Sequence, residues 1–189
     1  MKLLILLITT CLLCSCSQLY YGYLPGTDYK ILEPQRKVDL KGKSFDIQFV
    51  DSRDNVSKIS CSDHDLDRNT ELEGELGANL FRQSVLTMVR QSNGKIDPHS
   101  PNKLVVELEV ESFVLIGAGY IVPHGFTQFK VTSPFLSKRY CTDMSDHDDD
   151  SPLKWYSFAT RKSASRLIVS GATRRTAEQF VKDLADSNI

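Results

Sequence analysis

The stretch Lys103–Ile116, KLVVELEVESFVLI, is the most informative for the fold, because apolar and acidic residues alternate along it. The alternating residues form an apolar set, Leu104, Val106, Leu108 and Val110, and an acidic set, Glu107, Glu109 and Glu111. Successive side chains of an extended chain point to opposite faces, so the two sets lie on opposite faces of one strand. One buried and one wet face are typical of an antiparallel sheet. We expect cross-strand cations such as Lys130 to offset the glutamates.

Two segments on either side of this strand show helical periodicity. The first begins at Thr70, which makes a capping box with Glu73, and its apolar stripe ends before Asn93-Gly94. The second runs from about Ala164 to Asp186 and carries apolar residues on one helical face. Both stripes predict helices that pack on a core.

Three further segments are predicted to be strands. Ser44–Val50 alternates apolar and polar residues, residues 126–140 form a long strand interrupted at Pro134, and residues 154–160 form a shorter one. The predicted order is strand, helix, three strands, helix. This order fits an α+β layer, in which an antiparallel sheet of about four strands has two helices packed on one face.

The N-terminus carries the parts of a secretory signal. Lys2 supplies a short positive region, and Leu3–Leu13 is almost wholly apolar but too short to span a bilayer of ~30 Å as a helix. Leu13-Cys14-Ser15-Cys16 resembles the bacterial lipobox, in which an aliphatic residue stands three positions before the lipidated cysteine. We therefore expect residues 1–15 to be removed and Cys16 to become an acylated N-terminus. The alternatives are an ordinary signal cut near Ser15 and an uncleaved apolar N-terminus.

The resemblance to lipoprotein precursors implies a membrane address. Three acyl chains on Cys16 exceed the two signals that stable membrane attachment needs. The residue after the lipidated cysteine sorts lipoproteins between the two membranes of a didermal envelope, and here it is Ser17 and not aspartate. The expected location is the outer membrane. No acidic run follows Cys16, so we expect the periplasmic face.

Charge and length limit the class of protein. Removing residues 1–15 takes one of the 23 basic residues and none of the 24 acidic residues. The near balance of charge argues against nucleic acid as a partner, because that binding needs a concentrated basic face. The remaining 174 of the 189 residues suit one domain. We expect residues 16–43 to be the lipidated N-terminus and a tyrosine-rich, loop-like tether, and residues 44–189 to be a single α+β domain.

Two cysteines, Cys61 and Cys141, remain after the signal and the lipidated residue are set aside. An oxidising periplasm favours a disulfide between them. Such a bond would close a loop of about 80 residues, for which the chain-entropy model gives roughly 4.5 kcal/mol. The alternatives are two separate thiols, or a zinc site that adds His64 and His147.

Asp51-Ser52-Arg53 follows the first predicted strand. The lipobox, the tether, a strand ending in Asp-x-Arg, an amphipathic helix, long strands and a C-terminal helix together resemble small outer-membrane lipoproteins of the YajG kind. They resemble more loosely the N-terminal domains of envelope assembly factors and transport-auxiliary lipoproteins. The resemblance implies a non-enzymatic periplasmic domain that docks to other envelope components. From the residues alone, Asp51 and Arg53 pair or cap the loop, or Arg53 recognises a carboxylate or phosphate.

The acidic run Asp143–Asp150 has the spacing of the first ligands of a calcium loop. Ser151 and Ser157 stand where that loop requires glycine and glutamate, so we expect a solvated hairpin loop and no metal site. No Gly-x-Ser-x-Gly motif or other recognisable catalytic set is present, so we expect neither an enzyme nor a cofactor.

Arg174 and Arg175 lie on the last predicted helix. They are expected to flank its apolar stripe and face solvent, or to contact anionic head groups or an acidic partner protein. The predicted function is a membrane-anchored envelope lipoprotein that acts as a non-enzymatic binding or assembly module with an envelope protein partner. The alternatives are a lipid or lipopolysaccharide carrier, which needs an apolar cavity between sheet and helices, and a metal-assisted envelope hydrolase.

Overall fold

The computed structural model describes residues 20–23, 29–53, 58–63, 71–72, 74–116, 122–155 and 161–187. The signal sequence, Cys16 and the predicted capping box of Thr70 and Glu73 lie outside the described residues. The described elements are β1 (Tyr20–Tyr23), β2 (Lys30–Leu32), β3 (Ser44–Asp51), β4 (Glu71–Leu72), α2 (Gly74–Gln91), β5 (Lys95–Ile96), β6 (Lys103–Ile116), β7 (Val122–Thr132), β8 (Ser137–Ser145), the 3₁₀ helix η2 (Pro152–Trp155) and α3 (Arg161–Asp186).

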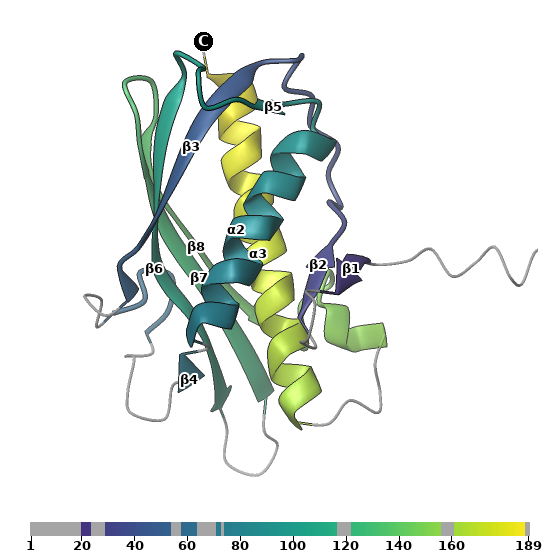
Figure 1. The fold of residues 1–189 in the computed structure, drawn as a ribbon. Coiled ribbons are helices and arrows are strands. Elements are labelled where there is room, and N and C mark those ends of the chain that lie inside the picture. The colour runs from purple at the N-terminus through teal and green to yellow at the C-terminus, as the bar shows by residue number, and fades with distance from the viewer. Residues whose placement is uncertain are drawn as a thin grey trace, which may run out of the picture.

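The main sheet is mixed. Its strand order is β5-β3-β6-β7-β8, with β4 paired to β6 (Figure 1). Strands β6, β7 and β8 are antiparallel neighbours, whereas β3 pairs in parallel with β6 and with β5. The prediction of a purely antiparallel sheet of about four strands is therefore wrong. The physical reason is the crossover through α2. It brings the chain back to the end of the sheet where β3 begins, so β6 runs in the same direction as β3.

The predicted strand at residues 126–140 is two strands. Strands β7 and β8 form a hairpin whose turn contains Pro134. Ser133 closes the turn, because its N–H donates to the Leu136 carbonyl at 2.9 Å and its Oγ accepts from the Leu136 N–H at 2.8 Å. The strand predicted at 154–160 begins in η2 instead, and residues 156–160 lie outside the described residues.

Both described helices cover one face of the sheet, as predicted (Figure 1). Helix α3 begins at Arg161 and continues through Gly171, where an added Cβ would collide with η2. The centre of the core is the Phe129 ring, whose centroid lies 4.9 Å from that of Phe81, 5.1 Å from that of Tyr140 and 5.8 Å from that of Phe180. These rings join the sheet to α2 and α3.

Strand β6 has the predicted bounds but not the predicted faces. Leu108 pairs with Phe129 and Val110 pairs with Gln128, so Glu109 is an extra residue in a β-bulge. The bulge exchanges the two faces beyond it. Val110 therefore packs on the face away from the helices, and Glu111 lies fully buried against α3. The predicted positions of these two side chains are wrong for that reason.

The segment expected to be a loop-like tether is in part folded. Strands β1 and β2 pair antiparallel, with Tyr20 opposite Leu32. Tyr29 is fully buried among apolar side chains of α2, α3, β6 and β8, and Leu40 is fully buried in the main core. The Lys30 N–H also donates to Ser170 Oγ at 3.2 Å. Residues 29–43 therefore pack with the domain.

Candidate functional site

Asp51 and Arg53 form an ion pair that fastens the end of β3 to the start of α2. Arg53 Nε donates to Asp51 Oδ1 at 2.8 Å and Arg53 Nη2 donates to Asp51 Oδ2 at 2.7 Å. The same Nη2 donates to the carbonyl oxygen of Gly74, the first residue of α2, at 2.6 Å. Arg53 is 8% exposed. This geometry agrees with the pairing interpretation and leaves the guanidinium poorly placed to recognise a ligand.

Replacing Asp51 with asparagine is expected to lower the free energy of unfolding by about 1 kcal/mol, because Arg53 loses its charged partner and Asp51 is half exposed. The hydrogen bonds from Arg53 hold the pKa of Asp51 below its usual range. A lowered folded pKa contributes stability above pH 4, so the difference from wild type fades as the pH falls below about 4. Urea titrations at pH 7 and pH 3 test this. Asp46→Asn is the control, and an equal loss for both variants would contradict the pairing.

Arg174 and Arg175 bind the acidic run that precedes η2. Arg174 Nη2 donates to Asp150 Oδ2 at 2.6 Å and to the Asp150 carbonyl oxygen at 3.0 Å. Arg175 bonds Asp150 and lies 2.9 Å from Asp148 Oδ1. Arg174 is only 4% exposed, so the expectation that it faces solvent is wrong. The physical reason is the acidic loop, which packs against α3 and whose carboxylates form ion pairs with both arginines.

Electrostatics within this cluster favour ion pairs over metal binding. Burial acts to raise the pKa of Asp150, but the hydrogen bonds and charge of Arg175, with the charge of Arg174, hold that pKa below its usual range. Burial likewise opposes the lowering of the pKa of Asp148 by Ser145 and Arg175. Two of the three carboxylates of the calcium-like spacing, Asp148 and Asp150, thus face arginine. Within the described ranges, no three His, Cys, Asp or Glu side chains gather as metal ligands.

A polar cavity of about 600 Å³ opens beside the cluster. Gln35 and Arg36 line it from the segment after β2, Asp149 lines it from the acidic run, and Glu178 and Gln179 line it from α3. The Gln35 N–H donates to Glu178 Oε1 at 2.6 Å. This hydrogen bond ties the N-terminal segment to α3, and the charged lining does not suit a lipid chain.

The disulfide between Cys61 and Cys141 is present, with their Cα atoms 5.7 Å apart. It fixes residues 58–63 over the face of the sheet that the helices leave uncovered. Ile59 is buried there against Val110 and Phe126. Both cysteines are used in this bond, so the zinc alternative fails. Its third residue, His64, lies outside the described residues.

Replacing Cys61 and Cys141 together with alanine is expected to lower the free energy of unfolding by about 2–4 kcal/mol, because the unfolded chain loses an 80-residue crosslink. Guanidinium titrations of the oxidised wild type, the reduced wild type and the double variant measure the effect. The last two should unfold at the same denaturant concentration. Reduction that leaves the wild-type midpoint unchanged would contradict the assignment.

The sheet also has an open face, which sequence reasoning did not single out. We define it as the outward side chains of Gln48, Val50, Lys103, Val105, Glu107, Lys130 and Arg139 on β3, β6, β7 and β8. Their neighbours along the strands pack in the core that the helices cover. Val50 is 45% exposed and Val105 is 38% exposed. Residues 58–63 cover this side of the sheet around Val110 and Phe126, and the open face is the part beside them that the helices also leave uncovered.

The charges of the open face are held in place. Arg139 donates to Glu109 through Nε at 2.7 Å and through Nη2 at 2.8 Å, and Gln128 Nε2 donates to Glu109 at 2.9 Å. Ser52 Oγ donates to Glu107 at 2.7 Å. Lys130 lies opposite Glu107 on β6, which is the expected cross-strand position, and opposite Arg139 on β8. The ion pair to a glutamate on this side of the sheet is made by Arg139 with Glu109.

No protein-family model matches the chain, and no curated protein matches it in sequence. Similar solved structures include a minor lipoprotein from Acinetobacter baumannii, with 6% identity over 80% of this chain and 98% of that chain and a TM-score of 0.41. A Xanthomonas campestris protein of the DUF330 family has 13% identity, coverages of 80% and 86%, and a TM-score of 0.44. Rare lipoprotein B from Shewanella oneidensis has 15% identity, coverages of 76% and 95%, and a TM-score of 0.40.

At these identities and TM-scores, the likeness assigns neither a family nor a function to this chain. Among the described residues, neither helix combines the length and the apolar composition that crossing a bilayer requires.

Proposed function

We propose that this chain is a lipid-anchored protein of the bacterial envelope that acts as a non-enzymatic binding or assembly module. The lipobox supplies the anchor at Cys16, and Ser17 directs the protein to the outer membrane, where it stays on the periplasmic face. The observation that carries the binding role is the open face of the sheet, which the helices leave uncovered.

The composition of the open face suits a protein partner. Val50 and Val105 are its exposed apolar side chains, and they lie near each other because Val50 pairs with Glu107 while Val105 pairs with Gln48. Protein interfaces commonly surround an apolar centre with a polar rim. Glu107 is held by Ser52, so its charge is already ordered before a partner binds. A preordered surface loses little side-chain entropy on association.

The two alternative functions have less support. A carrier needs an apolar cavity between sheet and helices, but the rings of Phe81, Phe129 and Phe180 fill the centre of that space. A hydrolase centred on the acidic run needs free carboxylates, but Asp148 and Asp150 are bound by arginine.

In-cell crosslinking of the full chain, followed by mass spectrometry of what copurifies, tests the proposal. Val105→Glu places a charge at the centre of the open face, and Cys16→Ala removes the anchor. Leu76→Glu is the matched control, because Leu76 is 41% exposed on α2. We expect one envelope protein to be enriched with wild type and with the Leu76 variant, and to be lost with the other two.

Enrichment of lipid or glycan alone would contradict the binding role and would favour the carrier. A partner retained equally by Val105→Glu and Leu76→Glu would show that the open face is not the binding surface.

A further inference from the structure

Very little chain separates the proposed anchor from the folded domain. Only residues 17–19 lie between Cys16 and β1, which begins at Tyr20. The Cα atoms of Cys16 and Tyr20 are four residues apart, so even a fully extended chain puts them at most about 14 Å from each other. The 28-residue tether expected at residues 16–43 therefore does not set the reach of the domain.

Strand β1 is tied to the domain through β2. Tyr20 pairs with Leu32, so the start of β1 lies beside the end of β2 and next to Glu33. Strand β2 is tied in turn to α3, because the Lys30 N–H bonds Ser170 and Tyr29 is fully buried. The start of β1 therefore lies close to Glu33, and the chain from Cys16 joins the domain there.

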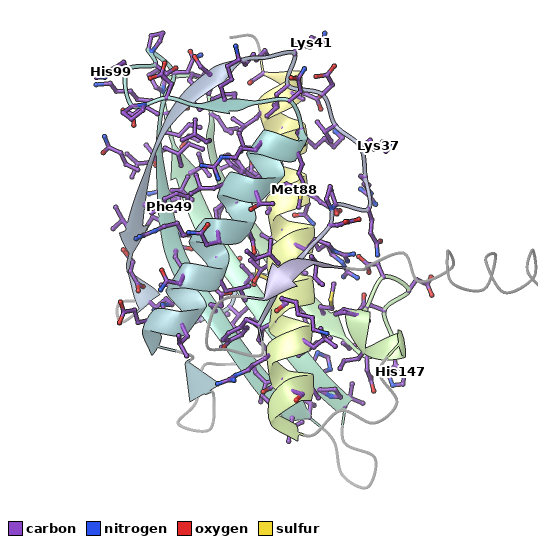
Figure 2. All side chains as sticks on the ribbon, turned by 45° about the vertical axis from the view of Figure 1, so that its right-hand side comes forward. Lys37, Lys41, Phe49, Met88, His99 and His147 are labelled. Carbon is purple, nitrogen blue, oxygen red and sulfur yellow. A yellow bond between two sulfur atoms is a disulfide. The ribbon has the colours of Figure 1, made fainter. Side chains whose placement is uncertain are left out.

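The β1–β2 pair lies on the outer side of the helices (Figures 1 and 2). Strand β2 contacts α2 and α3, and α3 contacts β7 and β8 on its other side. The layers run in the order β1–β2, helices, main sheet. At least one helix diameter, about 10 Å, thus separates the β1–β2 pair from the sheet, and the open face points away from the helices.

Charge on the β1–β2 side is mixed. Arg36 and Lys37 are exposed on the segment that follows β2, where Figure 2 shows Lys37 on the outer side of the helices. Basic side chains there suit anionic head groups. Glu33 and Asp149 are exposed acids in the same region, so the charge of this side does not favour a membrane, and the orientation follows from the short chain between Cys16 and β1.

We infer that acylated Cys16 holds the β1–β2 side of the domain against the lipid surface of the anchoring membrane and turns the open face of the sheet toward the periplasm. The inference rests on the proposed acylation of Cys16. A partner that approaches across the periplasm meets the open face, whereas a partner on the β1–β2 side competes with the bilayer.

Tryptophan quenching on vesicles tests the orientation. Trp155 is the only tryptophan of the chain, so Trp155→Phe gives a protein without tryptophan fluorescence, into which a single reporter tryptophan is introduced. Glu33→Trp reports on the β1–β2 side and Val50→Trp reports on the open face, and both positions are exposed. The acylated full-length variants are placed on phosphatidylethanolamine–phosphatidylglycerol vesicles that contain a lipid spin-labelled at its head group. We expect the tryptophan fluorescence of Glu33→Trp to fall at least twofold. The fluorescence of Val50→Trp should fall by less than one tenth.

A flexible insertion provides the control for chain length. Thirty glycine and serine residues placed between Ser17 and Gln18 have a root-mean-square length of about 30 Å, so the quenching at position 33 should fall toward that at position 50. Equal quenching at both positions in the acylated, vesicle-bound chain without the insertion would overturn the orientation while leaving the anchor intact. An unacylated Cys16, seen by mass spectrometry of the same samples, would overturn the proposed anchor and this inference together.

Discussion

Replacing Phe129 with alanine is expected to lower the free energy of unfolding by about 3–5 kcal/mol, the usual cost of removing a buried phenylalanine ring. The ring is fully buried and contacts Phe81 on α2, Phe180 on α3 and Tyr140 on β8. Its removal leaves a cavity at the point where the sheet meets both helices. This site has little freedom to collapse, because rings from three elements surround it.

Urea denaturation followed by far-ultraviolet circular dichroism measures the effect of Phe129→Ala. Val105→Ala, on the open face of the neighbouring strand, is the control and should change stability by less than about 0.5 kcal/mol. A loss below about 1 kcal/mol for Phe129→Ala would contradict the close packing of both helices on the sheet.

Replacing Arg174 with methionine is expected to lower the free energy of unfolding by about 2–4 kcal/mol at pH 7. Methionine keeps an apolar stem of similar length but leaves Asp150 and Glu178 without their buried cation. Removing one partner of a buried ion pair costs about 3–5 kcal/mol, and the lower figure here reflects the partial exposure of Asp150. Arg175→Met should cost less, because Arg175 is more exposed than Arg174.

The pH dependence of this loss has a definite sign. The folded pKa of Asp150 lies below its usual value, so its ion pair contributes stability above about pH 4 and loses it as the pH falls through the folded pKa. Burial raises the pKa of Glu178, so its dependence on pH is opposite to that of Asp150. The stability that Glu178 contributes is present at low pH and is lost as the pH rises through its folded pKa. The difference between wild type and Arg174→Met should therefore narrow at pH 3. A difference that is constant from pH 7 to pH 3 would contradict the ion-pair account.

Local patterns in the sequence predicted the elements better than their arrangement. The alternation at Lys103–Ile116 gave the bounds of β6, and the apolar stripes gave both helices. The predicted start of the first helix at Thr70 was wrong, because Glu71–Leu72 pairs with β6 as strand β4 and α2 begins at Gly74. The apolar–polar alternation of β3 and β6 does not show that they pair in parallel, because side chains alternate with a period of two in parallel and antiparallel strands alike. The bulge at Glu109 left no clear signal, because Val110 continues the apolar even positions past it and residues 113–116 are apolar at every position.

The parts of the site that depend on long-range contact were harder to predict. The cysteine count and an oxidising compartment made the Cys61–Cys141 disulfide the favoured prediction over two thiols or a zinc site, and the bond is present. Periodicity places Arg174 beside the apolar stripe of its helix but does not say which loop covers it. The opposite charges of the acidic run and the arginine pair were the available signal, because burial of an arginine requires a partner nearby. Tyr29 gave no comparable signal, because no apolar period surrounds it.

Both the proposed function and the orientation depend on the anchor, so the decisive measurement is the mass of the N-terminal peptide of the protein purified from the membrane fraction. We expect a peptide that begins at Cys16 and carries three acyl chains. A peptide that begins elsewhere, or that begins at Cys16 without lipid, would contradict the account.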